Sequence, residues 1–304
     1  MPTVSVIVAI YNHFNWLRMI LDALRMQSYK GFEVVIADDG SNEQTVKAIA
    51  DYCASHPEMR IIHSWQPDEG WRKPKCLNKA VIAASGEFLV FIDGDCVPHP
   101  RFVEDHLQLR KRGRVFGGRR VEMSKPVSDY MENQRILSPG YFSILQQNIL
   151  KNIFSSPLSL TWEQIRRTVR FPFIFGKPLQ LKRVGFMGCN FSIYRSDLES
   201  VNGFDERYID PGTGEDTDLC VRLKNAGITC IKSSRYALMF HRCHARLDFT
   251  SPNNARLIRE AQDKKVTFVE EGLVKKTHPT KNINVGATSV KCPQMEVFCD
   301  EIKN

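Results

Sequence analysis

The sequence has 304 residues, of which 42% are hydrophobic and 25% are charged, and these are the proportions of an ordinary globular protein. No stretch approaches the roughly 20 apolar residues that cross a bilayer as a helix, so no transmembrane segment is predicted. The formal net charge of +8 arises mostly between residues 151 and 185, and such a basic patch indicates an anionic partner without identifying it.

The nine cysteines are scattered along the chain and include no Cys-x-x-Cys pair. Disulfide frameworks and zinc sites use closer and more regular spacings, so we expect reduced thiols, several of them buried as small apolar side chains. The N-terminal residues carry neither a basic region nor a cleavage-site pattern, and no signal peptide is predicted there. These features favour a cytoplasmic protein.

Strand and helix patterns alternate over about the first hundred residues. The four predicted strands are Val4–Ile10, Phe32–Ala37, Arg60–His63 and Phe88–Ile92. The predicted helices between them are one through Leu17, Ile20, Leu21 and Leu24, one that opens with the capping-box pair Ser41 and Gln44 and runs through Tyr52, and one over Cys76–Ala84. This alternation predicts a parallel sheet with helices on both faces.

Polar residues directly follow three of these strands. Tyr11-Asn12 follows the first, Asp38-Asp39 the second and Asp93-Gly94-Asp95 the fourth. Ligands of such sheets sit beyond the carboxyl ends of the strands, so we expect these residues to converge on one crevice.

The motif Asp93-Gly94-Asp95 by itself indicates a turn as readily as a metal site. Asp39, however, stands at a neighbouring strand end, and three carboxylates packed together without a counterion would repel one another. A bound Mn²⁺ or Mg²⁺ would remove that repulsion and neutralise a diphosphate. We therefore favour a metal site here.

The familiar glycine-rich phosphate loops are missing from the sequence. No Gly-x-Gly-x-x-Gly turn follows the first strand, and no Gly-x-x-x-x-Gly-Lys occurs anywhere. A nucleotide diphosphate would therefore be held through a cation and side chains. Dehydrogenases and P-loop ATPases are disfavoured.

The second half is less regular. Val115–Val121 and Phe186–Tyr194 predict strands, and Leu219–Asn225 predicts a helix. Residues 277–304 have no strong periodicity and could form a loosely held tail.

Two polar clusters of this half could carry chemistry. Glu215 and Asp216 precede the predicted helix, where carboxylates can cap the helix, remove a hydroxyl proton, or do both. His241 and His244 follow an apolar run, and an imidazole there could complete the ligand shell of a borderline ion such as Mn²⁺. The alternative for the histidines is a partly buried or surface pair without a ligand.

Two basic segments allow more than one interpretation. The basic loop Gly70-Trp71-Arg72-Lys73-Pro74-Lys75, with its one Trp, could clamp a diphosphate, stack on a sugar ring or remain a solvated turn. Residues 131–185 mix aromatic and basic side chains, which fits an anionic membrane surface, a lipid-diphosphate acceptor, or a helical insertion packed on the core. No nucleic-acid-binding module accompanies the basic patch, so nucleic acid is not an expected partner.

The sequence resembles the family 2 glycosyltransferases of GT-A type from about residue 3 to residue 245. The segments that carry the resemblance are Val4–Asn12, Ile36–Ser41, Leu77–Ala80, Ala84–Glu87, Ile92–Asp95, Gly188–Ser192, Gly203–Glu206 and Gly214–Leu223. The second half is most similar to the galactosyltransferase and chondroitin-polymerase branch. Ala9 departs from the pattern, because many members carry Pro or Thr there.

The resemblance implies an α/β fold of GT-A type, with a mostly parallel, Rossmann-like sheet flanked by helices and a smaller acceptor-binding C-terminal part. It implies a nucleotide-sugar half at 1–125 and an acceptor-binding and catalytic half at 126–250, with the basic-aromatic insertion at about 131–185. A C-terminal helix and tail would occupy 251–304.

The resemblance also implies roles for matching positions. Tyr11 and Asp39 would contact the base, and Asp93 the ribose and diphosphate. Asp95 would be the main metal ligand, with Asp93 and His241 as further ligands and His241 preferred to His244. The remaining donor-binding residues would be Asn12, Gly94, Arg72 and Lys75.

The catalytic roles fall to the acidic pair. Asp216 would be the general base that removes the acceptor hydroxyl proton, and Glu215 would hold the acceptor. Members of the family invert the anomeric configuration.

We therefore predict an inverting, metal-dependent glycosyltransferase that moves a sugar from a UDP-linked donor to a glycan or lipid-diphosphate saccharide acceptor. We expect it to act in bacterial surface polysaccharide synthesis. It could lie at the inner face of the cell membrane. One alternative is a sugar-phosphate nucleotidyltransferase, whose Gly-rich, Arg-Lys-containing signature Tyr11-Asn12-His13 does not match. The other is a non-catalytic nucleotide-sugar-binding or glycan-binding protein.

Overall fold

The computed structural model describes residues 3–133, 141, 181–183, 185–244, 251–275, 290–292 and 295–297. Most of the basic-aromatic insertion at 131–185 and most of the tail at 277–304 lie outside these residues, as does most of the local surplus of positive charge. None of the helices in the described ranges is both long and apolar enough to cross a membrane.

A ten-stranded sheet runs through the molecule in the order β12-β13-β3-β2-β1-β4-β9-β6-β10-β8. Its strands are β1 (Val4–Ile10), β2 (Phe32–Asp38), β3 (Ile61–Trp65), β4 (Phe88–Asp93), β6 (Arg114–Gly117), β8 (Leu181–Arg183), β9 (Asn190–Tyr194), β10 (Thr229–Ser233), β12 (Val290–Cys292) and β13 (Met295–Val297). The strands β3, β2, β1 and β4 pair in parallel, whereas β9 runs antiparallel between β4 and β6. The carboxyl ends of the four parallel strands therefore share one edge.

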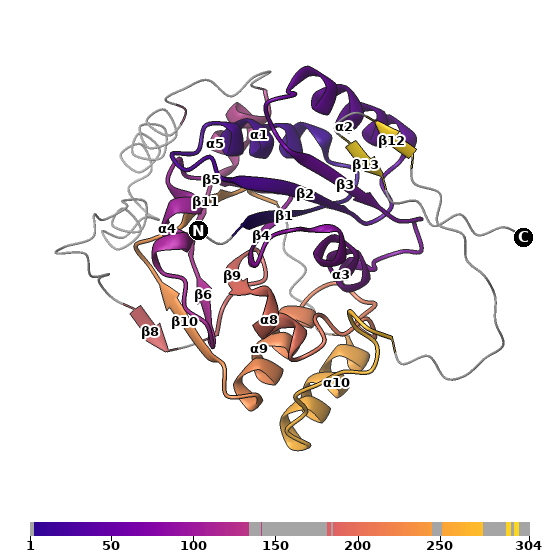
Figure 1. Cartoon of the computed structure of the whole chain (residues 1–304), viewed down its shortest axis with the longest axis vertical. Helices are drawn as coiled ribbons and strands as arrows, with labels where there is room; N and C mark the ends of the chain where they lie inside the picture. Colours follow the sequence, from indigo (N-terminus) through magenta and orange to yellow (C-terminus); the bar gives the residue numbers. More distant parts are fainter. Residues whose placement is uncertain are drawn as a thin grey trace, which may run out of the picture.

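Helices cover both faces of this sheet (Figure 1). They are α1 (Phe14–Arg25), α2 (Glu43–Ser55), α3 (Lys73–Ala83), α4 (Phe102–Gln108), α5 (Lys125–Glu132), α8 (Arg195–Glu199), α9 (Glu215–Asn225) and α10 (Pro252–Asp263). Val6 and Val8 of β1 pack in one core with α1 and α2, and Ile7 between them packs in the other core with α3 and α9. Because both faces are buried, the strand is apolar at consecutive positions. The predicted α/β fold, a mostly parallel sheet flanked by helices, is confirmed.

A second, three-stranded sheet has the order β5-β11-β7. Its strands are β5 (Cys96–Pro98), β7 (Arg119–Glu122) and β11 (Leu238–His241). In the antiparallel pair of β5 and β11, His241 stands opposite Cys96. In the parallel pair of β11 and β7, His241 stands opposite Glu122. This small sheet thus brings residues from the two halves of the chain to one place.

The predicted strand Val115–Val121 is wrong as a single element. The chain breaks at Gly118, so that β6 joins the large sheet and β7 joins the small one. A Cβ atom at Gly118 would lie 2.5 Å from both the Ala237 carbonyl oxygen and the Asn190 Oδ1 atom. Tertiary contacts with distant residues therefore set this break, and local propensity does not reveal them.

Other predicted boundaries shift as well, and the helix predicted from Leu219 begins at Glu215, so that Glu215 and Asp216 lie in its first turn. The strand predicted from Phe186 begins only at Asn190, because the residues between them form a turn. The predicted cap Ser41 is replaced by Asn42, whose side chain accepts a hydrogen bond from the Thr45 backbone nitrogen. Helix α3 begins at Lys73 rather than at Cys76, with Pro74 in its first turn.

Candidate active site

A pocket of about 550 Å³ opens at the carboxyl ends of β1, β2 and β4, which is a size that suits a small-molecule ligand. Its lining residues are Ala9, Ile10, Tyr11, His13, Trp16, Ala37, Asp39, Asp68, Gly70, Trp71, Lys73, Cys76, Asp93, Gly94, Asp95, Arg242 and His244. The structure therefore brings together the predicted residues Tyr11, Asp39, Asp93, Gly94 and Asp95. Gly94 can pack there because it lacks a side chain, since a Cβ atom would lie 2.4 Å from the Ala9 carbonyl oxygen.

Asp39 is fixed at one end of the pocket by two donors. The Gln66 Nε2 atom donates to Oδ1 at 2.7 Å, and the backbone nitrogen of Arg72 donates to Oδ2 at 2.9 Å. Burial raises the pKa of Asp39, although these hydrogen bonds oppose the rise. Nearby, the Tyr11 hydroxyl donates to Asp68 Oδ2 at 2.9 Å.

Asp38, the neighbour of Asp39, points into the protein interior instead. Its Oδ2 atom lies 2.8 Å from Nε2 of the buried His63, and its Oδ1 atom accepts a hydrogen bond from the Ser41 backbone nitrogen. Side chains alternate in direction along an extended chain, so the two acids point to different sides. Asp38 accepts the hydrogen bond from the turn at Ser41, and Asp39 faces the pocket.

Three predicted donor-binding residues lie outside the pocket lining. Asn12 joins two loops, because its backbone nitrogen donates to Ser41 Oγ and its Oδ1 atom accepts from the Asn42 backbone nitrogen. The Arg72 guanidinium donates to the Trp71 carbonyl oxygen. The Lys75 ammonium pairs with Glu69, Nζ to Oε2, at 3.0 Å.

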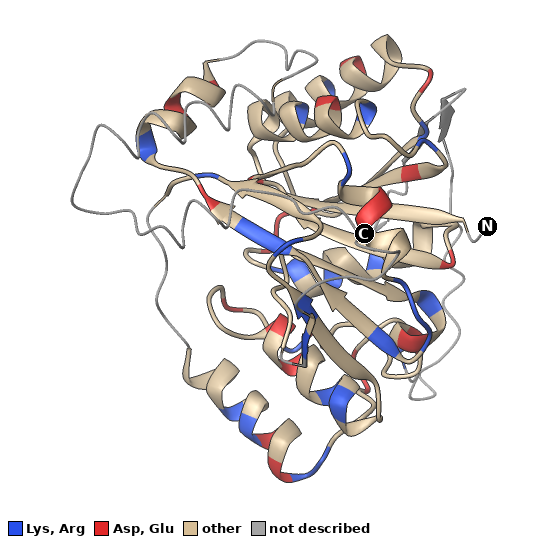
Figure 2. Cartoon of the chain, turned by 90° about the vertical axis from the view of Figure 1, so that its left-hand side faces the viewer, with Lys and Arg blue, Asp and Glu red and all other residues tan. Residues whose placement is uncertain are grey.

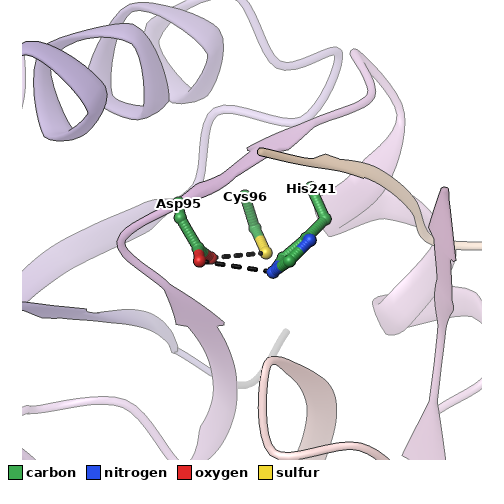
Figure 3. Close-up of side chains that lie close together, drawn as sticks. All are labelled: Asp95, Cys96 and His241. Atoms are coloured by element: carbon green, nitrogen blue, oxygen red, sulfur yellow. Dashed lines mark hydrogen bonds and ion pairs between the residues drawn. The ribbon is translucent and has the colours of Figure 1, made fainter. Parts of the chain in front are cut away.

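Asp95, Cys96 and His241 bring three potential metal-ligand atoms within 4.8 Å of one another (Figure 3). His241 Nε2 lies 3.3 Å from Asp95 Oδ2, and the Cys96 thiol donates to Asp95 Oδ1 at 3.1 Å. Behind the imidazole, His241 Nδ1 lies 2.8 Å from Glu122 Oε2. A carboxylate on the far nitrogen is the arrangement that orients histidine ligands of metals. The donor set of carboxylate and imidazole fits a divalent cation.

Without an ion, the three side chains interact through protons. Burial lowers the pKa of His241, but hydrogen bonds to Asp95 and Glu122 outweigh it and raise the pKa to about 9. Burial raises the pKa of Asp95, yet the hydrogen bond from His241 holds that pKa well below its usual range. Burial also raises the pKa of the Cys96 thiol well above its usual value. A bound cation would take the place of these protons.

His244 also reaches Asp95. Its Nε2 atom lies 3.1 Å from Asp95 Oδ2, and its ring centroid lies 5.0 Å from that of His241. The His244 side chain is 42% exposed and that of His241 only 8%. His241 is thus the more firmly held of the two, and His244 stands at the pocket surface.

Lys73 connects Asp93, at the end of β4, to the acidic pair of α9. Its ammonium lies 2.9 Å from Asp93 Oδ1 and 3.3 Å from Glu215 Oε1. Burial lowers the pKa of Lys73, but the negative charges of Asp93 and Glu215 outweigh this effect and raise the pKa well above its usual value. The ammonium therefore stays charged. For Glu215, burial raises the pKa and Lys73 opposes the rise. Asp93 therefore faces Lys73 and lies outside the group formed by Asp95, Cys96 and His241.

Sequence reasoning chose Arg72 and Lys75 in this loop and missed Lys73. A signal was available, because proline is favoured in the first turn of a helix and Pro74 indicates that α3 starts at Lys73. That start fixes the direction of the Lys73 side chain.

Asp216 is held by a close approach to the turn before β9. The Gly188 backbone nitrogen donates to Asp216 Oδ2 at 2.9 Å, and the Thr217 hydroxyl lies 3.3 Å from Oδ1. A Cβ atom on Gly188 would lie only 2.9 Å from the Asp216 Cβ atom. Glycine at this position lets the backbone reach the carboxylate.

Basic and acidic residues are interspersed along the part of the chain that the structure describes (Figure 2). On α10, for instance, Glu260 lies 3.5 Å from Arg256 and 3.0 Å from Lys264. The pocket lining contains the four acids Asp39, Asp68, Asp93 and Asp95 together with the basic residues Lys73 and Arg242.

Comparison with known families gives two matches. The model described as Glycosyl transferase family 2 matches residues 5–196, and the model described as the N-terminal domain of galactosyltransferase matches residues 177–245. Glycosyltransferase AglE of Haloferax volcanii is 30% identical over 106 residues, which are 34% of this chain and 34% of that protein. Validoxylamine A glucosyltransferase of Streptomyces hygroscopicus is 27% identical over 238 residues, which are 75% of this chain and 52% of that protein. The chain thus spans between a third and about half of the length of these relatives.

Two solved structures share the arrangement of the elements. GalNAc-T7, solved with UDP, GalNAc and Mn²⁺, has a TM-score of 0.58 at 15% identity, covering 85% of this chain and 48% of that one. Mannosyltransferase PcManGT of Pyrobaculum calidifontis, in complex with GDP-Man and Mn²⁺, has a TM-score of 0.53 at 17% identity, covering 86% of this chain and 69% of that one. At this level of identity the similarity concerns the fold.

Proposed function

Because this chain belongs to glycosyltransferase family 2 and has the GT-A fold, we propose that it transfers a sugar from a nucleotide diphosphate donor to a hydroxyl group of a saccharide, with inversion. The observation that carries this proposal is the pocket at the strand ends, which Asp39, Asp93 and Asp95 line and where Lys73 lies between Asp93 and Glu215. It offers room for a donor next to carboxylates that can serve an acceptor.

We propose UDP as the nucleotide and Mn²⁺ or Mg²⁺ as the ion. GalNAc-T7 was solved with UDP and PcManGT with GDP-Man, each with Mn²⁺, which supports a nucleotide-sugar donor and a divalent cation. Asp39 can accept a hydrogen bond from the ring N–H of uracil, while the Tyr11 ring can lie against the base. Guanine also has a ring N–H, so the test must compare the two nucleotides.

Asp95 and His241 would hold the ion, with Glu122 orienting the imidazole. When bound, such an ion neutralises the charge that develops on the departing diphosphate. Asp93 and the Lys73 ammonium lie beside that place and can position the donor. Asp93 as a further ligand, and His244 as a substitute for His241, remain predictions for the same experiment.

Asp216 is proposed as the general base. It would take the proton of the acceptor hydroxyl while that oxygen forms a bond to the anomeric carbon and the bond from that carbon to the diphosphate oxygen breaks. A single displacement of this kind inverts the configuration. Glu215 would hold the acceptor hydroxyls.

Release of the nucleotide tests the proposal. The protein is incubated with Mn²⁺ and a panel of UDP-linked and GDP-linked sugars, and slow donor hydrolysis is followed by release of UDP or GDP. We expect release from at least one UDP-sugar and its loss in Asp216→Asn, with donor affinity kept. Binding without turnover for every donor would favour a nucleotide-sugar-binding protein, and formation of a nucleotide sugar from a sugar phosphate would favour a nucleotidyltransferase.

The proposed acceptor is a glycan or a lipid-diphosphate saccharide of a bacterial surface polysaccharide, and the proposed place of action is the inner face of the cell membrane. The basic and aromatic composition of residues 131–185 supports an anionic lipid partner. Flotation with vesicles that contain or lack anionic lipid tests the membrane contact. Transfer to soluble oligosaccharides, compared with lipid-diphosphate saccharides, tests the acceptor.

A further inference from the structure

We propose that Cys96 is a third protein ligand when a thiophilic divalent ion such as Zn²⁺ or Co²⁺ occupies the site of Asp95 and His241, so that its sulfur sets the metal preference of this protein. The inference rests on the metal site of the proposed function. It concerns an additional ligand whose effect can be measured without any sugar transfer.

The spacing of the three side chains carries the proposal. The sulfur lies 3.1 Å from Asp95 Oδ1, and the ligand atoms of all three residues lie within 4.8 Å of one another. Two ligand atoms of a tetrahedral zinc site with bonds of about 2.0–2.3 Å are separated by roughly 3.3–3.8 Å. The three atoms therefore need only small side-chain movements to surround one ion.

The backbone holds this spacing rigidly. Cys96 and His241 are directly opposite each other in the antiparallel pair of β5 and β11, and Cys96 is fully buried. Figure 3 shows the sulfur and the imidazole pointing to the same side as the Asp95 carboxylate. A small buried cysteine can also be mere packing, but packing alone does not direct the sulfur to a carboxylate that a histidine shares.

When the ion binds, the sulfur–metal bond replaces the S–H bond of Cys96, and the proton leaves to water. No electron transfer is involved.

Ion chemistry then separates two kinds of occupant. Mn²⁺ and Mg²⁺ prefer oxygen and accept imidazole, so they can use Asp95 and His241 and leave the thiol protonated. Zn²⁺ and Co²⁺ accept thiolate readily, so they would recruit Cys96 as well. The sulfur would thereby give Zn²⁺ an affinity that Mn²⁺ does not gain.

Titration of the full chain with Co²⁺, in the absence of any donor, tests the proposal. We expect a near-ultraviolet thiolate-to-cobalt charge-transfer band in the wild type and its loss in Cys96→Ser. Competition titrations should show that Cys96→Ser weakens Zn²⁺ binding by at least about tenfold and changes Mn²⁺ binding by less than about threefold. Cys189→Ser and Cys243→Ser, which change a neighbouring buried thiol and an exposed one, should keep the band.

Several results would overturn the inference. Co²⁺ binding without a charge-transfer band in the wild type would do so even if Cys96→Ser failed to fold. A band that persists in Cys96→Ser, or one that disappears only in Cys243→Ser, would assign the sulfur elsewhere. Normal Mn²⁺ binding together with any of these results would leave the proposed function intact. Failure of every ion to bind the wild type would contradict both the proposed function and the role of Cys96.

Discussion

Lys73 forms ion pairs with two carboxylates from distant parts of the chain. Its ammonium compensates the charges of Asp93, at the end of β4, and Glu215, at the start of α9. Glu215 is almost fully buried, and Lys73 is its ion-pair partner. If Lys73 were neutral, a buried carboxylate would lose the charge that compensates it.

We predict that Lys73→Met lowers the free energy of unfolding by about 1–3 kcal/mol. This loss is smaller than that for breaking a fully buried ion pair, because the Lys73 side chain is partly exposed to solvent. Urea unfolding measures the loss. Lys73→Arg should retain most of the stability, and Glu215→Gln in the Lys73→Met background should restore part of it because the uncompensated charge is gone. Equal losses in all three variants would contradict this account.

Asp95 accepts hydrogen bonds from both neighbours in the three-residue group. We predict that Asp95→Ala weakens the Mn²⁺-dependent binding of UDP by at least about 100-fold, because the carboxylate supplies the ion's negatively charged ligand. Calorimetry with and without Mn²⁺ measures the effect. Asp68→Asn, which changes another pocket carboxylate outside the group, should leave the Mn²⁺ dependence in place.

At the scale of elements, the packing of β6, β7 and β9 against the Ala237 turn decides how the two sheets divide the chain. Gly118 lies at the division, and its backbone nitrogen donates to the Asn190 carbonyl oxygen. The Asn190 side chain in turn donates to the Ala237 carbonyl oxygen at 2.8 Å. No space remains at Gly118 for a side chain.

Gly118→Ala should therefore destabilise the protein by about 2–3 kcal/mol, because a Cβ atom would overlap two atoms that the surrounding structure fixes. Chemical denaturation followed by circular dichroism checks this value. Gly185→Ala serves as a control, since among the described residues its Cβ atom would meet only the Cys220 sulfur, at an ordinary 3.5 Å. The prediction fails if the two variants are equally stable.

His106 connects α4 to the same strand. Since Asn190 Oδ1 can only accept, His106 Nε2 donates to it, and Nδ1 accepts from the Ser192 hydroxyl at 2.8 Å. Burial lowers the pKa of His106 from 6.5 to about 3. The imidazole is therefore neutral in the folded protein over the pH range in which the unfolded chain binds a proton there.

This difference in pKa predicts an acid sensitivity with a definite sign. As pH falls from 6.5 towards 3, the unfolded state gains a proton at His106 that the folded state does not, so stability declines by up to about 1.4 kcal/mol per pH unit. Between pH 7 and pH 5 the wild type should lose about 2 kcal/mol more than His106→Gln. Urea unfolding at the two pH values measures the difference, and His13→Gln, which changes an exposed histidine, should behave as the wild type does.

At the scale of the whole molecule, the alternating first half was open to prediction, and the small sheet was not. The strands Val4–Ile10 and Phe88–Ile92 could be predicted because burial on both faces makes them mostly apolar. Asp39 and Asp95 could be predicted because they follow such strands. The pairing of Cys96 with His241, with Glu122 behind, depends on contacts between distant segments. No local pattern of residues encodes those contacts.

The whole molecule should also respond to its ligands as one unit. If UDP binds only in the presence of the ion, UDP and Mn²⁺ at about 100 times the dissociation constant should stabilise the fold by about 2.7 kcal/mol. For a chain of this size that corresponds to a rise in Tm of roughly 3–5 °C. Differential scanning fluorimetry with UDP alone, Mn²⁺ alone and both together measures the coupling, and additive shifts would argue against it.

The pairing of β5 with β11 has a consequence for how the molecule is made. Asp95 and Cys96 leave the ribosome long before His241, and the loop that joins them must close before the imidazole arrives. Contacts of such long sequence separation form slowly, because the entropy lost on loop closure opposes them. The nascent first half therefore lacks His241, and Asp95, Cys96 and His241 come together only when the second half of the chain has been synthesised and has packed.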